Sequence, residues 1–165
     1  MTPKRGFEPV VDADTRLLIL GSLPGDASLK EGQYYGHPRN GFWRLIGEVI
    51  GADLPALPYL DRLETLRARG IGLWDVIASA DRPGSLDSAI RNAEPAGLNR
   101  LIADLPSLQA VAFNGGTASR LGRRSLTAPP GLRLLDLPSS SPAHARPLAE
   151  KSAVWSTLKP FARPR

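Results

Sequence analysis

Four short, nearly continuous apolar runs recur along the chain, each bounded by glycine, proline or polar residues. They span residues 16–21, 71–77, 108–113 and 132–137. Runs of this length and composition are typical of strands that are buried on both faces, as in a parallel sheet. The pattern therefore predicts four buried strands.

Helical patterns alternate with these runs. In residues 38–50 the apolar positions form one helical stripe, with Pro38 near its start and Gly51 at its end. Further helices are predicted over 59–69, 96–105, from 116 to 121 and over 148–158, and residues 79–84 are predicted to form a loop. Alternating strands and helices indicate an α/β fold, a three-layer sandwich with a central four-stranded parallel sheet. We expect a single domain over 1–165, with its core at about 16–158.

Parallel sheets bind their ligands at the carboxyl ends of the strands. The segments that follow the four predicted strands are 21–40, 75–84, 114–117 and 138–146. These four segments are therefore the places where we expect functional residues.

Composition limits the chemistry that those segments can carry. The chain has 165 residues, of which 42% are hydrophobic, so it can bury a substantial core. It has no cysteine, which excludes disulfides, thiolate nucleophiles and cysteine-based zinc sites. Its two histidines lie in no metal-binding spacing, and we expect neither a metal nor a cofactor. No signal peptide or membrane-spanning run is visible, so we expect a soluble, cytoplasmic protein.

Charge is distributed unevenly along the chain. The net charge is +5, and residues 116–165 contain nine basic but only two acidic side chains. An excess of this kind favours an anionic partner, although an ordinary solvated surface explains it equally well. The basic residues concerned are Arg120, Arg123, Arg124, Arg133, Arg146, Lys151, Lys159, Arg163 and Arg165.

Two motifs follow the first predicted strand. Gly-Ser-Leu-Pro-Gly at 21–25 could direct backbone N–H groups at an anion, but a plain tight turn is the competing interpretation. The segment 34–43 brings aromatic rings, His37 and Asn40 to a helix entrance. Aromatic rings in a loop can stack on a base or sugar. For His37 a structural hydrogen bond, and for Asn40 a helix cap, are the simpler explanations.

Three motifs together carry a resemblance. Gly-Ser-Leu-Pro-Gly at 21–25, His-Pro-Arg-Asn-Gly-Phe-Trp at 37–43 and Leu-Pro-Ser-Ser-Ser-Pro-Ala-His at 137–144 follow the predicted strands in order. They resemble the uracil-DNA glycosylase superfamily, and within it the hypoxanthine-DNA (deoxyinosine) glycosylase branch. The resemblance implies a monofunctional DNA glycosylase that works as a monomer without a cofactor. Such an enzyme flips a deaminated base out of DNA and hydrolyses its N-glycosidic bond, which leaves an abasic site.

The resemblance also implies a catalytic residue. In mismatch-specific uracil glycosylases of this superfamily the first motif reads Gly-x-Asn-Pro-Gly, and its Asn holds the attacking water. Leu23 stands at that position here and cannot orient water. In the hypoxanthine branch the role passes to the Asn of the His-Pro-x-Asn segment, which is Asn40. A neutral amide positions a water rather than deprotonating it early, so the glycosidic bond would break first.

Other residues receive roles in base recognition from the same matching. Tyr35 would stack on the flipped base, and Asp75 falls near the residue that reads the base edge, with a loop cap as the alternative. Asn114 ends the third strand, and its amide could donate to O6 and accept from N1–H of hypoxanthine, or simply form a turn. The expected base-binding set is Gly21, Ser22, Leu23, Tyr35, Asp75 and Asn114.

The serine-rich segment is expected to bind DNA. In relatives this loop grips the phosphate backbone and inserts into the gap that the flipped nucleotide leaves. The residues concerned are Ser139, Ser140, Ser141, Pro142, Ala143 and His144. Lys30 is the only lysine expected near the cleft, so no lyase chemistry is predicted. The alternatives are a glycosylase mainly for uracil or xanthine, a non-catalytic DNA-damage binder, and a protein acting on free nucleosides.

Overall fold

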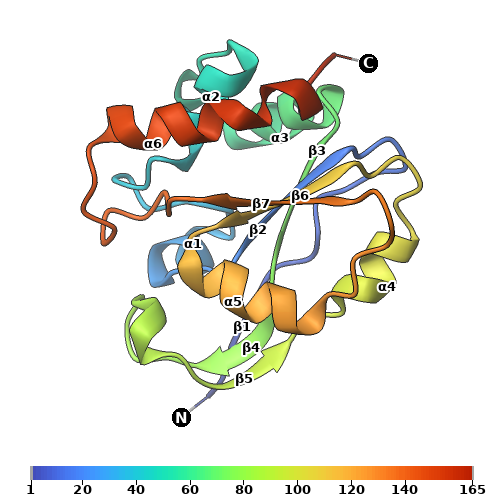
Figure 1. The fold of residues 1–165 in the computed structure, drawn as a ribbon. Coiled ribbons are helices and arrows are strands. Elements are labelled where there is room, and N and C mark those ends of the chain that lie inside the picture. Colours follow the sequence, from blue (N-terminus) through green and yellow to red (C-terminus); the bar gives the residue numbers. More distant parts are fainter. Residues whose placement is uncertain (1, 165) are drawn as a thin grey trace.

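A computed structural model describes residues 2–164 of the chain (Figure 1). Its central sheet is parallel, in the order β3-β2-β6-β7. The strands are β2 (Leu17–Gly21), β3 (Ile71–Asp75), β6 (Ala110–Asn114) and β7 (Arg133–Leu137). Every residue of β2 and β6 is buried. The predicted four-stranded parallel sheet is therefore confirmed.

Helices cover both faces of this sheet, as Figure 1 shows. On one side lie α2 (Phe42–Ile50), α3 (Tyr59–Ala68) and α6 (Leu148–Trp155), which continues into the 3-10 helix η3 (Ser156–Phe161). On the other lie α4 (Leu98–Ala103) and α5 (Gly116–Ser125). Because side chains alternate along a strand, β2 supplies both cores. Leu17 and Ile19 pack in one core, and Leu18 and Leu20 pack in the other.

A second, small antiparallel sheet differs from the sequence prediction. It has the order β1-β4-β5 and consists of β1 (Lys4–Arg5), β4 (Ile77–Asp81) and β5 (Arg91–Pro95). The predicted loop over 79–84 is therefore wrong in its first half. The predicted strand over 71–77 is also divided, because β3 ends at Asp75 and Ile77 begins β4 of the small sheet. All five residues of β5 are exposed, so no apolar pattern marks that strand.

Three short helices lie in segments without a helical prediction. These are α1 (Asp26–Glu31), η1 (Leu54–Ala56) and η2 (Asp87–Ala89). The first falls inside the long segment after β2, and it has six residues, too few to show an apolar period.

The carboxyl ends of the parallel strands meet at one edge of the sheet. Gly21 at the end of β2 pairs with Asp75 at the end of β3, and Asn114 at the end of β6 pairs with Leu137 at the end of β7. This register places the segments that follow the four strands side by side. The segments that carry the three sequence motifs therefore share one end of the molecule.

Candidate active site

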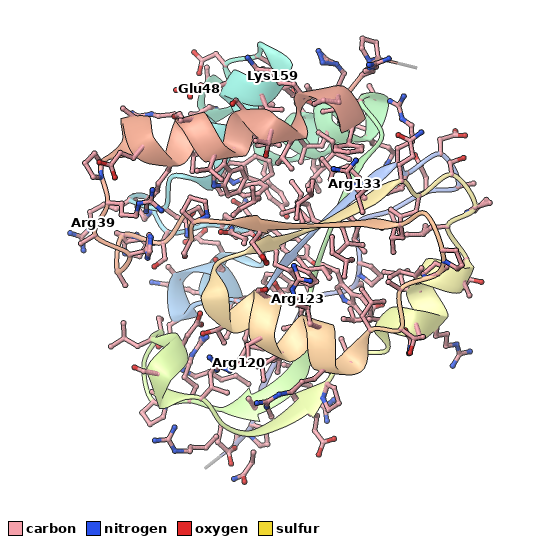
Figure 2. The ribbon with its side chains drawn as sticks, viewed as in Figure 1. Arg39, Glu48, Arg120, Arg123, Arg133 and Lys159 are labelled. Carbon is pink, nitrogen blue, oxygen red and sulfur yellow. The ribbon has the colours of Figure 1, made fainter. Side chains whose placement is uncertain are left out.

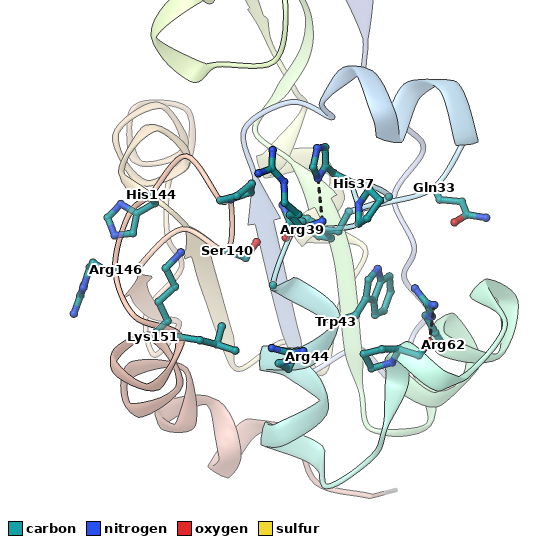
Figure 3. A pocket seen from close by; sticks show the side chains of 18 of the residues that line it. Gln33, His37, Arg39, Trp43, Arg44, Arg62, Ser140, His144, Arg146 and Lys151 are labelled. Carbon is teal, nitrogen blue, oxygen red and sulfur yellow. Dashed lines mark hydrogen bonds between the residues drawn. The ribbon is translucent and has the colours of Figure 1, made fainter.

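An open cleft of about 690 Å³ lies between the segment before α2 and the serine-rich loop (Figure 3). Tyr35, His37 and Asn40 line one side, and Ser140 and His144 line the other. The two sides are joined directly, because the backbone N–H of Gly41 donates to Ser140 O at 2.9 Å. The structure thus brings Asn40 and the serine-rich loop together at a single cleft.

Buried side chains anchor the serine-rich loop from below. The Asn114 amide makes two hydrogen bonds to Ser140: its Nδ2 donates to the hydroxyl and its Oδ1 accepts from the backbone N–H, both at 2.9 Å. From α6, Lys151 Nζ donates to Ser141 O at 3.2 Å and Trp155 Nε1 donates to Pro138 O at 3.0 Å. These bonds fix the loop on rigid elements, which is what a binding site requires.

The tip of the loop is open to solvent. Pro142, Ala143 and His144 are all exposed. Ser139 and Ser141 form local turns, in which the Ser139 hydroxyl accepts from Ser141 N and the Ser141 hydroxyl accepts from Ala143 N. The tip is therefore available for contact with a large ligand, while its base is held in place.

Asn40 has a structural role as well as a place in the cleft. Its Oδ1 accepts a hydrogen bond from Phe42 N at 2.9 Å, which fixes the amide at the first turn of α2. A carbonyl oxygen can accept twice, so this contact leaves one acceptor position on Oδ1. The Asn40 Nδ2 group makes no hydrogen bond within residues 2–164, so its two N–H donors are also available. The helix-cap interpretation and the water-positioning hypothesis are thus compatible.

Tyr35 stands between the open cleft and a buried polar group. Its backbone φ is +55°, a conformation that non-glycine residues adopt at a cost and that is concentrated at functional sites. Its ring stacks on Phe42, with centroids 3.9 Å apart and planes 14° apart. Because Phe42 covers one face of the ring, only the opposite face is left for a base.

Behind Tyr35, its hydroxyl and the Asp75 carboxyl approach Gly21 closely. A Cβ at Gly21 would lie 2.7 Å from Asp75 Oδ1 and 3.0 Å from Tyr35 Oη. Tyr35 Oη and Asp75 Oδ2 are buried and make no hydrogen bond of ordinary geometry among the described residues, although the Asn114 side chain lies beside the Tyr35 hydroxyl. We call these two groups the buried polar pair. Only glycine at position 21 leaves room for both.

Burial sets the protonation of the buried polar pair. It raises the pKa of Asp75 to about 7, an effect that the nearby Asp87 carboxylate increases and Arg82 opposes. Burial and the charge of Asp75 also raise the pKa of the Tyr35 hydroxyl. This environment keeps a substantial protonated fraction of Asp75 at neutral pH.

Sequence analysis missed Arg82, which organises the Gly21–Gly25 turn. The Arg82 side chain is 1% exposed, and it donates to the carbonyls of Leu23 (3.3 Å), Pro24 (2.5 Å) and Gly84 (3.0 Å). Its position in the segment 75–84, which follows a predicted strand, could have indicated a role at the site.

Two residues of the expected base-binding set point away from the cleft. Leu23 packs in the hydrophobic core next to α5, and Ser22 Oγ donates to Asp87 at 2.7 Å.

Lys151 was also missed. It lines the cleft, whereas Lys30 does not, so the expectation about Lys30 is corrected. Lys151 is 4% exposed, and burial lowers the pKa of its amine. Its charge stays close to the cleft because Nζ is held by Ser141 O.

Positive charge is concentrated in the cleft, which we call the cationic cleft. Among the described residues, no aspartate or glutamate lines it, and its basic residues are Arg39, Arg44, Arg62, Arg146 and Lys151. Of the eight described basic residues between 116 and 164, only Arg146 and Lys151 are among them. Figure 2 shows Arg120 and Arg123 on α5, and Arg133 at the opposite end of the sheet from Arg39. Most basic residues of the carboxyl-terminal half therefore lie away from the cleft, and Arg165 lies outside the described residues.

Comparison with known proteins agrees with this geometry. The model of the uracil DNA glycosylase superfamily matches residues 8–159, and the chain belongs to this superfamily. The chain is 42% identical over 153 residues to a protein named hypoxanthine DNA glycosylase from Methanosarcina barkeri, covering 93% of this chain and 96% of that one. It is 41% identical over 155 residues to a protein of the same name from Methanosarcina acetivorans, covering 94% and 97%.

A solved structure shows the same fold. It is a solution NMR structure of a candidate uracil DNA glycosylase from Methanosarcina acetivorans, with a TM-score of 0.80 and 40% identity. The similarity covers 96% of this chain and 99% of that one. Within residues 2–164, no helix is long and apolar enough to cross a bilayer, and no group of three potential metal ligands is found.

Proposed function

We propose that this protein is a monofunctional DNA glycosylase that excises hypoxanthine from deoxyinosine and leaves an abasic site. The observation that carries the proposal is the Gly41–Ser140 hydrogen bond, which joins the Asn40 turn and the serine-rich loop across one cationic cleft. The two relatives named hypoxanthine DNA glycosylase support the choice of base. Such an enzyme acts on DNA inside the cell as a monomer.

Asn40 is the catalytic residue of this proposal. With one side of Oδ1 held by Phe42 N, the remaining acceptor position of the amide can orient a water in the cleft. An amide is too weak a base to deprotonate that water early. The N-glycosidic bond therefore breaks first, and the oriented water adds to the oxocarbenium-like sugar that results.

The cationic cleft serves DNA binding and the reaction together. Phosphate oxygens favour guanidinium and ammonium groups, and their neutralisation makes binding salt-dependent. The exposed tip at residues 142–144 would fill the space from which the nucleotide is flipped, and Ser139 and Ser141 would contact the backbone. Charge that develops on the departing base is stabilised by the same positive surroundings.

A panel of duplexes tests this function. Each duplex carries deoxyinosine, deoxyuridine, deoxyxanthosine or 5-hydroxymethyluracil at one position, and alkali converts abasic sites to strand breaks. We expect breaks at inosine, and none before alkali treatment. Cleavage at uracil alone would assign the protein to another branch, and cleavage at none of the bases would favour the non-catalytic damage binder that Leu23 suggests.

Replacing Asn40 tests the catalytic assignment. We expect Asn40→Ala to lower the single-turnover rate on inosine by about 100-fold or more, because the water loses its orientation, while DNA affinity changes little. Asn40→Asp is the matched control, since a carboxylate still accepts from Phe42 N and can hold a water. An alanine variant with wild-type turnover, or a loss that simply follows a loss of DNA binding, contradicts the assignment.

A further inference from the structure

The buried polar pair is the feature that the proposed chemistry leaves unexplained. Buried polar atoms are nearly always hydrogen-bonded, and each exception needs a reason. Tyr35 Oη and Asp75 Oδ2 are two such exceptions at one place, in side chains that both occupy the space beside Gly21. The strained backbone of Tyr35 adds a further cost at the same point. A site that keeps these costs is built to be completed by a ligand.

We infer that Tyr35 Oη and the Asp75 carboxylate together read the lactam edge of the flipped base, with Tyr35 Oη donating to the 6-oxo group and Asp75 accepting from N1–H. This inference rests on the proposed function and assigns its specificity. It gives Tyr35 a second role, because the sequence argument expected only stacking from its ring. Hydroxyl and carboxylate supply the one donor and one acceptor that a lactam needs.

Asn114 is the other candidate for this donor, and its position argues against it. Both ends of its amide are engaged by Ser140, at 2.9 Å each. Turning that amide toward a base would release the buried Ser140 from its partner and loosen the loop. Asn114 therefore serves as a positioning residue for the serine-rich loop. Its side chain also donates toward Tyr35 Oη, so the hydroxyl oxygen accepts there and its proton remains for the base.

The pair distinguishes bases by the order of donor and acceptor along one edge. Hypoxanthine presents an oxygen acceptor beside an N–H donor. Adenine presents the reverse, an amino donor beside a ring nitrogen acceptor. The Tyr35 hydroxyl can accept from that amino group, but the ionised Asp75 carboxylate meets the N1 lone pair with another acceptor. A ligand that leaves buried polar groups without partners binds much more weakly than one that pairs with them. Adenine, the normal base that hypoxanthine derives from, is thereby disfavoured where Asp75 is ionised.

Protonation of Asp75 links this recognition to pH. The groups that face the carboxyl are Asp87 in η2, Arg82 after β4, and Tyr34 and Tyr35 after α1. Burial raises the pKa of Asp75 to about 7, so the acceptor form gains population as pH rises through neutrality. Inosine recognition should therefore strengthen between pH 6 and pH 8.

Tyr35→Phe tests the inference, because it removes the hydroxyl and keeps the ring that stacks on Phe42. The probes are duplexes with uncleavable 2′-fluoro-deoxyinosine or 2′-fluoro-deoxynebularine, which lacks both the 6-oxo group and N1–H. We expect the wild type to bind the inosine duplex about tenfold more tightly, and Tyr35→Phe to bind the two alike. We also expect the variant to excise inosine about 10-fold to 100-fold more slowly.

The same experiment separates this inference from the proposed function. A wild type that does not excise inosine overturns the function itself. A Tyr35→Phe variant that keeps the full preference for the inosine duplex, or loses affinity equally for both probes, overturns the inference alone. Asp75→Asn supplies the second arm, because its side chain does not titrate. We expect it to abolish the rise in inosine excision between pH 6 and pH 8, and an unchanged rise would contradict the role of Asp75.

Discussion

The cationic cleft and the buried polar pair meet at Tyr35 but differ in exposure and charge. The cleft is open, holds about 690 Å³ and is lined by basic side chains. The pair is enclosed, has no spare room at Gly21 and contains an acidic group with a raised pKa. Exposed charges attract any DNA, whereas a tight polar enclosure selects one base edge. The difference shows how the chain can separate affinity from base choice.

The largest effect is expected where the enclosure is tightest. In Gly21→Ala the new methyl group would lie 2.7 Å from Asp75 Oδ1 and 3.0 Å from Tyr35 Oη, so the buried polar pair must move. Because small displacements at a reacting centre are costly, we expect inosine excision to fall by about 100-fold or more, with DNA affinity nearly unchanged. Single-turnover rates and fluorescence anisotropy measure the two quantities.

Gly97→Ala is the control for this change. Its nearest neighbour would be Arg100 Cβ at 4.0 Å, so a methyl group fits there without displacement. We expect wild-type rates from it. Excision by Gly21→Ala at the rate of this control would show that the enclosure behind Tyr35 does not select the base.

Substitutions in the cationic cleft are expected to weaken DNA binding and to leave the base preference unchanged. Arg39 and Arg44 line it, and their guanidinium groups make no ion pair among the described residues. The double variant Arg39→Ala, Arg44→Ala should bind all duplexes about tenfold more weakly and lower the salt dependence of binding by about two phosphate contacts. The preference for inosine over adenosine duplexes should persist. Titrations at several salt concentrations provide the slope.

The matched control removes the same charge elsewhere. Arg120→Ala, Arg133→Ala changes two basic residues of the carboxyl-terminal half that do not line the cleft. We expect the salt slope to stay near its wild-type value. Equal slopes for the two double variants would show that overall charge, rather than the cleft, governs DNA binding.

The smallest effect concerns the support of the cleft. Trp155→Phe keeps most of the buried ring but removes the donor that holds Pro138 O at 3.0 Å. We expect the free energy of unfolding to fall by about 1 kcal/mol, with inosine preference unchanged. Urea denaturation measures the stability change. A loss of base preference in this variant would mean that the serine-rich loop, and not the buried polar pair, reads the base.

The central sheet could be predicted because each of its strands is a continuous apolar segment between polar boundaries. Leu17 to Leu20 are all 0% exposed, and such a run has few alternatives. The small sheet could not be predicted, because its strands are held by backbone pairing rather than by an apolar pattern. Asn92, in the fully exposed β5, even has a positive φ of +54°.

The site was predictable in part. Asn40 and the serine-rich loop stand after the correct strands, and parallel pairing brings such segments together. The hydroxyl of Tyr35 gave no signal, since its role depends on contact with Gly21 and Asp75, which are distant in sequence. Arg82 and Lys151 were missed because a charged residue is normally exposed, and only tertiary carbonyl partners allow these two to be buried.

A crystal structure with a duplex that carries 2′-fluoro-deoxyinosine is the most direct test of the central claim. The account predicts that the hypoxanthine is flipped into the cleft between Asn40 and Ser140, at the hydroxyl edge of Tyr35. It also predicts that the 6-oxo group lies within hydrogen-bond distance of Tyr35 Oη and N1 within hydrogen-bond distance of Asp75. A base that stays stacked in the duplex, or one that is flipped but turns this edge away from Asp75, would contradict it.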